Sequence, residues 1–108
     1  MSANHGLTDA TMAQIHEALS RFPEVDKAIL YGSRAKGDYK PGSDVDLTLL
    51  GAGLTQKILG RIQDELEDGQ LPYRFDLSIL SQITHGDLIE HIRRGGVVFY
   101  EKKPVPAK

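Results

Sequence analysis

The sequence predicts a small α/β (α+β) protein in which helices pack on a mixed central sheet. Short apolar runs bounded by turn residues alternate along the chain with amphipathic segments of helical spacing, the pattern of a helix-covered sheet. The chain has 108 residues, of which 40% are hydrophobic and 26% charged, as is usual for one globular domain. We therefore expect a single domain over 1–100 and a flexible tail over 101–108, which contains Pro104 and Pro106.

The first half of the chain predicts a helix, a strand, a helical turn and a second strand. Apolar residues recur at helical spacing from Thr8, which can cap the helix, to Phe22, and Pro23 ends it. The apolar run 27–31 stops at Gly32 and predicts a buried strand. The next segments predict a helical turn, a loop rich in turn residues and a strand, over 33–36, 37–43 and 44–50.

The second half adds two helices and two strands. Apolar residues four apart predict an amphipathic helix over 54–68. Thr84 opens a run that resembles a capping box, with Asp87 in place of the usual Glu. The other predicted elements are a strand over 73–80, a helix over 84–94 that stops at two glycines, and a strand over 97–100.

Composition excludes several classes of protein. The absence of cysteine rules out a disulfide framework and a thiolate metal site. A net charge of −2 gives no overall attraction to nucleic acid or to a membrane surface. No apolar run approaches the ~20 residues of a membrane-spanning helix, and no secretory signal is visible at the N-terminus. We therefore expect a cytoplasmic protein without an extended nucleic-acid surface.

Three carboxylates are predicted to meet on one face of the sheet. Side chains of a strand alternate between faces, so Asp44 and Asp46 project together while the intervening apolar residues fill the core. Asp76 has the corresponding place in the predicted strand 73–80. If these strands are neighbours, the three carboxylates converge, and their repulsion must be relieved by protonation or by a cation.

Magnesium and a nucleotide suit this pattern. Hard cations prefer oxygen ligands, and Mg²⁺ typically takes one or two carboxylates together with phosphate oxygens. Two such ions can clamp the attacking and leaving oxygens of a phosphoryl displacement. Gly32 lets a phosphate approach the backbone, and Ser33 adds a hydroxyl at the start of a helical turn. Arg34 and Lys36 are near enough to neutralise phosphate charge.

The spacing of these residues resembles a known family. Gly32-Ser33, ten further residues and Asp44-Val45-Asp46 are similar to the Gly-Ser-x10-Asp-x-Asp signature of the DNA polymerase beta-like nucleotidyltransferases. The runs Gly-Ser-Arg-Ala-Lys-Gly and Ser-Asp-Val-Asp-Leu especially resemble the minimal nucleotidyltransferases of bacteria and archaea. Asp76 matches the third carboxylate of that pattern, and the resemblance covers about 28–80.

The resemblance implies a small nucleotidyltransferase fold that transfers a nucleoside monophosphate, AMP from ATP, and releases pyrophosphate. It implies that Asp44 and Asp46 hold two Mg²⁺ ions, and that Asp76 binds the catalytic ion and helps to deprotonate an acceptor hydroxyl. The nucleotide-binding candidates are Gly32, Ser33, Arg34 and Ser43.

The resemblance also implies a partner. Larger members of the family carry a further domain for the base or the acceptor, whereas only 28 residues follow Leu80 here. Minimal members are commonly encoded beside a small helical HEPN protein, a toxin for which the nucleotidyltransferase is the antitoxin. The antitoxin can place AMP on a tyrosine of this toxin. We therefore expect a HEPN-type partner that presents the acceptor, and a homo- or hetero-oligomer.

Two alternative functions stay open: a catalytically silent fold that neutralises its partner by contact, and transfer to a small molecule or an RNA end. A haloacid dehalogenase-like phosphatase, suggested by Asp-x-Asp-x-Thr at 44–48, is disfavoured because a loop precedes the motif. A calcium loop is excluded because Thr48 and Leu49 stand where a ligand and a glycine are required. Taken singly, Asp76 could instead pair with a nearby base. We expect Tyr31 in the core and assign no histidine to the site.

Overall fold

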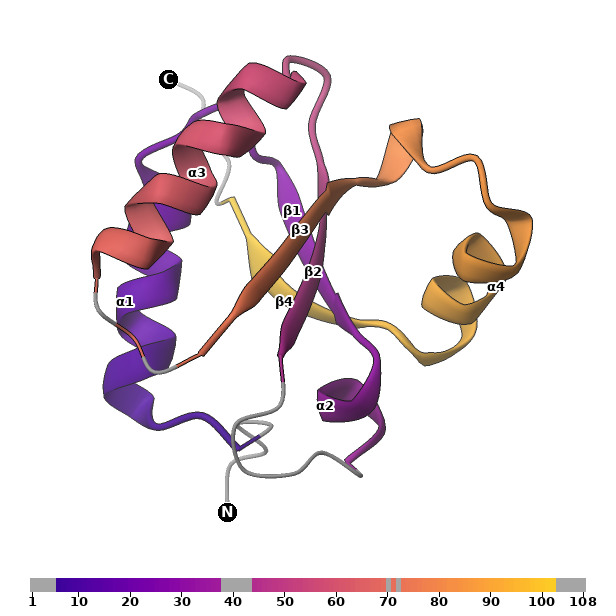
Figure 1. The fold of residues 1–108 in the computed structure, drawn as a ribbon, viewed down its shortest axis with the longest axis horizontal. Helices are drawn as coiled ribbons and strands as arrows, with labels where there is room; N and C mark the ends of the chain where they lie inside the picture. Colours follow the sequence, from indigo (N-terminus) through magenta and orange to yellow (C-terminus); the bar gives the residue numbers. More distant parts are fainter. Residues whose placement is uncertain (1–5, 38–43, 70, 72, 103–108) are drawn as a thin grey trace, which may run out of the picture.

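The computed structural model describes residues 6–37, 44–69, 71 and 73–102 of the chain (Figure 1). Helices and strands alternate through most of it, as the sequence predicts. In chain order the elements are α1 (Asp9–Ser20), β1 (Lys27–Tyr31), α2 (Ser33–Lys36), β2 (Val45–Leu50), α3 (Gln56–Asp68), β3 (Phe75–Ile79), the 3-10 turn η1 (Leu80–Gln82), α4 (Gly86–Gly95) and β4 (Val97–Glu101).

The four strands form one mixed sheet in the order β3-β2-β1-β4. β1 is antiparallel to both β2 and β4, whereas β2 is parallel to β3. A parallel pair needs a crossover connection, and α3 supplies it between β2 and β3. The small α+β fold with a mixed sheet and packed helices is therefore confirmed, including the adjacency of the two strands that carry the aspartates.

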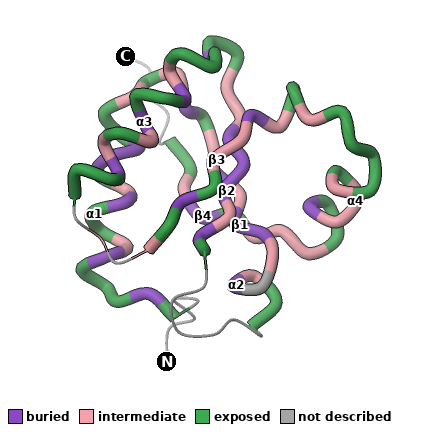
Figure 2. Tube along the Cα trace, viewed as in Figure 1, coloured by how far each residue is buried: buried purple, intermediate pink, exposed green. Residues whose placement is uncertain are grey.

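One face of the sheet forms the hydrophobic core with α1 and α3, which lie together on that side (Figure 1). The alternate residues Val45, Leu47 and Leu49 of β2 are fully buried there, as their spacing predicts. Figure 2 shows buried positions concentrated in the strands and on the inner sides of these two helices. Burial of this face stabilises the sheet and leaves the opposite face available for a site.

The opposite face carries α2 and α4 instead (Figure 1). α4 packs against the sheet only lightly, since Ile92 is its single buried residue. This face is covered only in part, since Thr48 is buried there while Ile29 and Asp46 are partly exposed. No helix in the described part of the chain is long and apolar enough to cross a membrane.

Several boundaries differ from the predictions by one or two residues, and the reasons are local. α1 ends at Ser20 rather than Phe22, because the residue before Pro23 is disfavoured in helical conformation. β2 and β3 are shorter than predicted, because their ladder begins at the pair Val45 and Phe75. The tail predicted over 101–108 begins inside β4, which includes Glu101, and residues 103–108 lie outside the described chain.

The start of α4 also differs from its prediction. The sequence predicts Thr84 as the cap of this helix, but His85 is the N-cap, and its Nδ1 accepts a hydrogen bond from the backbone N–H of Leu88 at 3.2 Å.

A second histidine joins two elements far apart in the sequence. Nε2 of His16 in α1 lies 2.8 Å from the carbonyl oxygen of Phe99 in β4, and the two rings meet edge to face. Both histidines therefore have structural contacts.

Candidate active site

Two carboxylates lie side by side on the open face of the sheet. Asp46 of β2 and Asp76 of β3 are directly paired in the parallel ladder. Paired residues of neighbouring strands project from the same face, so the two side chains share one patch. Asp76 is exposed, whereas Asp46 is partly buried. Asp44 lies one residue before β2 and is exposed.

The pKa of the Asp46 carboxyl is raised above its ordinary value. Burial is the largest cause, and the charges of Asp76 and Asp44 add to it. Asp44 and Asp76 therefore both act electrostatically on Asp46. An anionic patch that is partly withdrawn from water favours a bound cation or a proton. The electrostatics thus fit a site for divalent metal ions.

The geometry fits a metal site completed by substrate. Within the residues that the structure describes, no group of three or more His, Asp or Glu side chains, the three predicted aspartates included, is arranged to hold a metal ion by itself. Magnesium does not require one, because it usually takes one or two carboxylates together with phosphate oxygens and water. The paired Asp46 and Asp76, with Asp44 close enough to influence Asp46, match that donor set.

Gly32 brings the backbone against these carboxylates. It follows β1, and its φ of +82° lies in the left-handed region that favours glycine. A β-carbon at Gly32 would overlap Oδ2 of Asp46. The next residue, Ser33, begins α2. The Gly-Ser pair is therefore held at the edge of the carboxylate patch, where a polyphosphate could bridge the two.

The arginine that the sequence predicts as a nucleotide-binding residue is buried instead. Arg34, one of the nucleotide-binding candidates, is only 2% exposed, and its guanidinium carbon lies 5.0 Å from the centre of the Tyr73 ring. It therefore packs inside the protein, where it joins α2 to the segment before β3. Lys36 of the same helix is exposed. Ser43, a further nucleotide-binding candidate, lies outside the described residues.

A hydroxyl group that the sequence did not indicate lies beside the carboxylates. Tyr31 is 8% exposed, as expected for a core residue, yet it is paired with Asp46 and so shares its face. Its hydroxyl is hydrogen-bonded to Ser78 of β3, and Ser78 Oγ is 2.9 Å from Oγ1 of Thr48. Burial raises the pKa of the Tyr31 hydroxyl; the bond to Ser78 lowers it, and the charges of Asp76 and Asp46 raise it further.

The hydroxyls of Tyr31, Ser78 and Thr48 link three strands, because β2 lies between β1 and β3 and the Tyr31 side chain must pass over it. Such buried or half-buried polar chains fix the relative positions of the groups they join. The sequence signal for the position of Tyr31 was strand periodicity, since Tyr31 and Ile29 are two residues apart and share one face of β1. The partner strands were not apparent from that periodicity.

Comparisons with known proteins agree with this geometry. A family model described as "Polymerase beta, Nucleotidyltransferase" matches residues 13–105. A search of the curated proteins finds no match. A crystal structure of a toxin-antitoxin with AMP-PNP is similar with a TM-score of 0.68 and 18% identity, covering 90% of this chain and 76% of that chain.

Two further structures share the fold. The toxin-antitoxin MntA-HepT is similar with a TM-score of 0.65 and 18% identity, covering 88% of this chain and 74% of that chain. The tri-AMPylated Shewanella oneidensis HEPN toxin in complex with MNT antitoxin is similar with a TM-score of 0.65 and 16% identity, covering 89% of this chain and 74% of that chain. At this level of identity the likeness shows a common fold.

Proposed function

Because the chain belongs to the polymerase beta nucleotidyltransferase family, we propose that it transfers AMP from ATP to an acceptor hydroxyl and releases pyrophosphate. One observation carries this proposal. The partly buried carboxylate of Asp46 lies between Gly32 of the Gly-Ser pair and Asp76 of the neighbouring strand. This arrangement supports a single patch in which the chain would bind a polyphosphate, a divalent cation and an acceptor hydroxyl.

The three aspartates have distinct roles in this proposal. Asp44 and Asp46 would hold Mg²⁺ with the phosphate oxygens, and Asp76 would share the ion nearest the acceptor. Bound there, Mg²⁺ would neutralise the charge that develops on the phosphoryl oxygens. The acceptor oxygen attacks the α-phosphorus, the bond from that phosphorus to the departing pyrophosphate breaks, and Asp76 takes the acceptor proton. Gly32 and Ser33 hold the β- and γ-phosphates.

The proposed acceptor is a tyrosine hydroxyl on a HEPN-type toxin encoded nearby, for which this chain would be the antitoxin. Support comes from the structures with the same fold, which include a toxin-antitoxin with AMP-PNP and an AMPylated HEPN toxin bound to an MNT antitoxin. The open sheet face agrees with an acceptor supplied by a second chain.

The test uses the purified chain, Mg²⁺, the product of the neighbouring gene and ATP labelled at the α-phosphate. We expect label on the partner protein, and none when the label is on the γ-phosphate, because AMP rather than phosphate is transferred. Asp46→Asn should abolish transfer. Asp64→Asn, on the exposed surface of α3, is the matched control and should leave transfer unchanged.

The outcomes separate the competing functions. If no label is transferred while wild type and Asp46→Asn bind the partner equally tightly, the protein is a binding module and the enzymatic proposal is wrong. If ATP is consumed to the same extent without any second protein and a small product carries the label, the acceptor is a small molecule. If the Asp46→Asn variant still transfers label to the partner, this carboxylate patch is excluded as the catalytic site.

A further inference from the structure

The open face of the sheet continues past the carboxylates into an apolar groove beneath α4. The groove has a volume of about 320 Å³, and its lining is mainly apolar. It lies between β1, β4 and α4, and its main side chains are Ile29, Leu80, Ile89, Ile92, Arg93 and Val98. We call this set the α4 groove. The carboxylate patch is polar, so two chemically different surfaces lie next to each other on one face.

Two large hydrophobic side chains of the α4 groove are exposed to solvent. Ile89 is 37% exposed and Val98 is 57% exposed, and these are the large hydrophobic side chains left exposed in the described part of the chain. Single exposed apolar residues are common on protein surfaces and need no explanation. Here both exposed residues line the same groove. Their clustering indicates a surface that an apolar group covers.

The α4 groove lies on the same face of the sheet as the carboxylate patch, with Tyr31 between them. Ile29 precedes Tyr31 by two residues, so their side chains lie on the same face and about 7 Å apart. Tyr31 is paired with Asp46, and Ile29 is paired with Thr48. The groove therefore begins one row of side chains away from the carboxylates. A molecule bound at Asp46 through a phosphate could reach the groove with its next ring system.

Size favours a small planar group over a protein segment. Pockets for small ligands usually measure ~300–1,000 Å³, and the α4 groove is at the lower end of that range. A specific protein interface covers about 800 Å² on each partner, far more than this short stretch of helix and strand provides. Arg93 adds a flat guanidinium at the edge, which can stack on an aromatic ring or donate hydrogen bonds to it.

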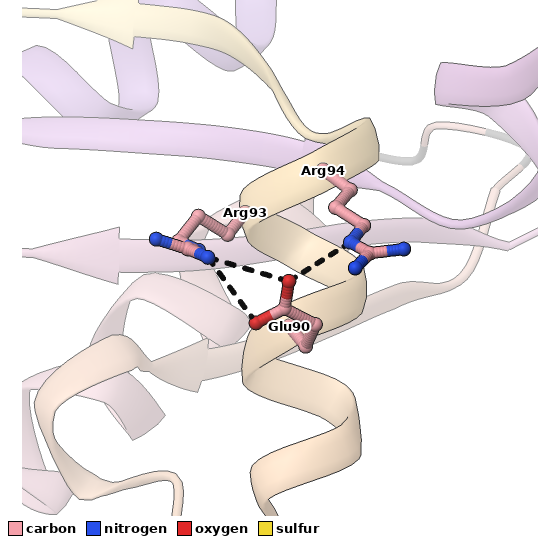
Figure 3. A network of polar contacts seen from close by, with 3 residues as sticks. All are labelled: Glu90, Arg93 and Arg94. Carbon is pink, nitrogen blue, oxygen red and sulfur yellow. Dashed lines mark hydrogen bonds and ion pairs between the residues drawn. The ribbon is translucent and has the colours of Figure 1, made fainter.

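The neighbouring charges leave Arg93 available for such a contact. Arg93 and Arg94 both approach Glu90, with Arg93 Nη2 at 3.4 Å and Arg94 Nε at 2.8 Å from Oε2 (Figure 3). One carboxylate therefore serves two guanidinium groups, and the side chain of Arg93 is 76% exposed. Because an exposed ion pair of this kind is weak, Arg93 can turn toward a ligand at little cost.

We propose that the α4 groove holds the nucleobase of the nucleoside triphosphate. The polyphosphate then lies at Gly32, the α-phosphate lies between Asp46 and Asp76, and the ribose passes over Tyr31. This proposal rests on the proposed function, because it assumes that the carboxylate patch binds a nucleoside triphosphate. It gives the minimal chain its own contact with the base, so that only the acceptor must come from a second protein.

The test compares two ligands by calorimetry in the presence of Mg²⁺: ATP, and inorganic tripolyphosphate, which has no base. The double variant Ile89→Asn/Val98→Thr makes the groove polar at two exposed positions, and circular dichroism checks its fold. We expect its affinity for ATP to fall roughly tenfold, while its affinity for tripolyphosphate stays within about twofold of wild type.

The two arginines provide a matched control. Arg93→Ala should weaken ATP binding without affecting tripolyphosphate, whereas Arg94→Ala should change neither, since Arg94 shares Glu90 but does not line the groove. The proposal would be overturned if the double variant lost affinity for ATP and for tripolyphosphate equally, or if its affinity for ATP were unchanged. Unchanged ATP affinity with weaker binding of the partner protein would assign the groove to that partner. If the wild type binds neither ligand, the proposed function itself is wrong.

Discussion

The carboxylate of Asp46 lies so close to Gly32 that a β-carbon at that position would overlap Oδ2. Gly32 also has a positive φ, so two independent constraints require glycine at this position. The contact couples the Gly-Ser segment to the carboxylate patch, because neither can shift without disturbing the other. Substitutions at these residues and their neighbours test this coupling.

Gly32→Ala should abolish transfer and lower the free energy of unfolding. The positive φ alone costs about 1–3 kcal/mol for alanine. The added methyl group must also displace Asp46, and a misplacement of ~1 Å can reduce a rate about 100-fold. Gly37→Ala is the matched control, because Gly37 has a φ of +89° but no described atom within 4 Å of the added carbon. Equal transfer rates in the two variants would contradict the coupling.

Asp76→Asn should lower the rate of transfer by roughly 10²–10⁴-fold while ATP binding changes only a few-fold. In the proposed mechanism Asp76 accepts the proton of the acceptor hydroxyl and contributes to one metal ion, whereas the Gly-Ser side of the site would hold most of the nucleotide. Stability should not fall, because Asp76 is exposed and its charge repels that of Asp46. Single-turnover transfer and ATP titration measure the two effects, and Asp64→Asn serves as the reference.

The raised pKa of Asp46 predicts how stability depends on pH when no metal is present. A carboxyl whose pKa is raised by folding stabilises the protein below the ordinary carboxyl range, and this contribution is lost as pH rises through the raised pKa. Asp46→Asn should therefore unfold at a higher temperature than wild type at pH 7 in EDTA. The difference should vanish below about pH 3, where the Asp46 carboxyl is neutral in both the folded and the unfolded chain. A lower unfolding temperature for the variant at pH 7 would contradict the shift.

The hydrogen bond between Tyr31 and Ser78 should appear as a coupling energy. Tyr31→Phe and Ser78→Ala each remove one partner, and a double-mutant cycle isolates their interaction. We expect a coupling of about 0.5–1.5 kcal/mol in urea unfolding, the usual net value of a hydrogen bond in a protein. Additive effects of the two substitutions would show that the hydroxyls act independently. Thr48→Val tests the next bond of the chain.

Arg34 should contribute to folding even without nucleotide. Arg34→Met keeps an apolar stem of similar length but removes the guanidinium over Tyr73, and we expect a loss of about 2 kcal/mol or more. Lys36→Met, at an exposed position of the same helix, should change stability by less than ~0.5 kcal/mol. If Arg34→Met leaves unfolding unchanged and weakens only ATP binding, its role is that of a phosphate ligand, as the sequence analysis predicted.

Much of the fold followed from local patterns. β1 and α2 have the predicted bounds, and the ends of the other predicted elements differ by no more than two residues, whereas η1 was not predicted. The alternation in β2 correctly divided core residues from the face that carries Asp46. These features depend on backbone periodicity and on capping and turn residues, which a short segment determines by itself. The site roles of the aspartates and of Gly32-Ser33 stay predictions that activity measurements must decide.

Other features depended on which elements pack together. Strand periodicity predicted which face of the sheet carries Asp46 and Asp76. Only the pairing of β2 with β3 in the folded sheet shows that the two residues lie directly side by side. The burial of Arg34 against Tyr73, and the α4 groove, likewise join segments that are distant in the sequence. A side chain's direction is set by its own backbone, so the sequence determined it. Its neighbours and its access to water are set by tertiary packing, so only the folded structure decided them.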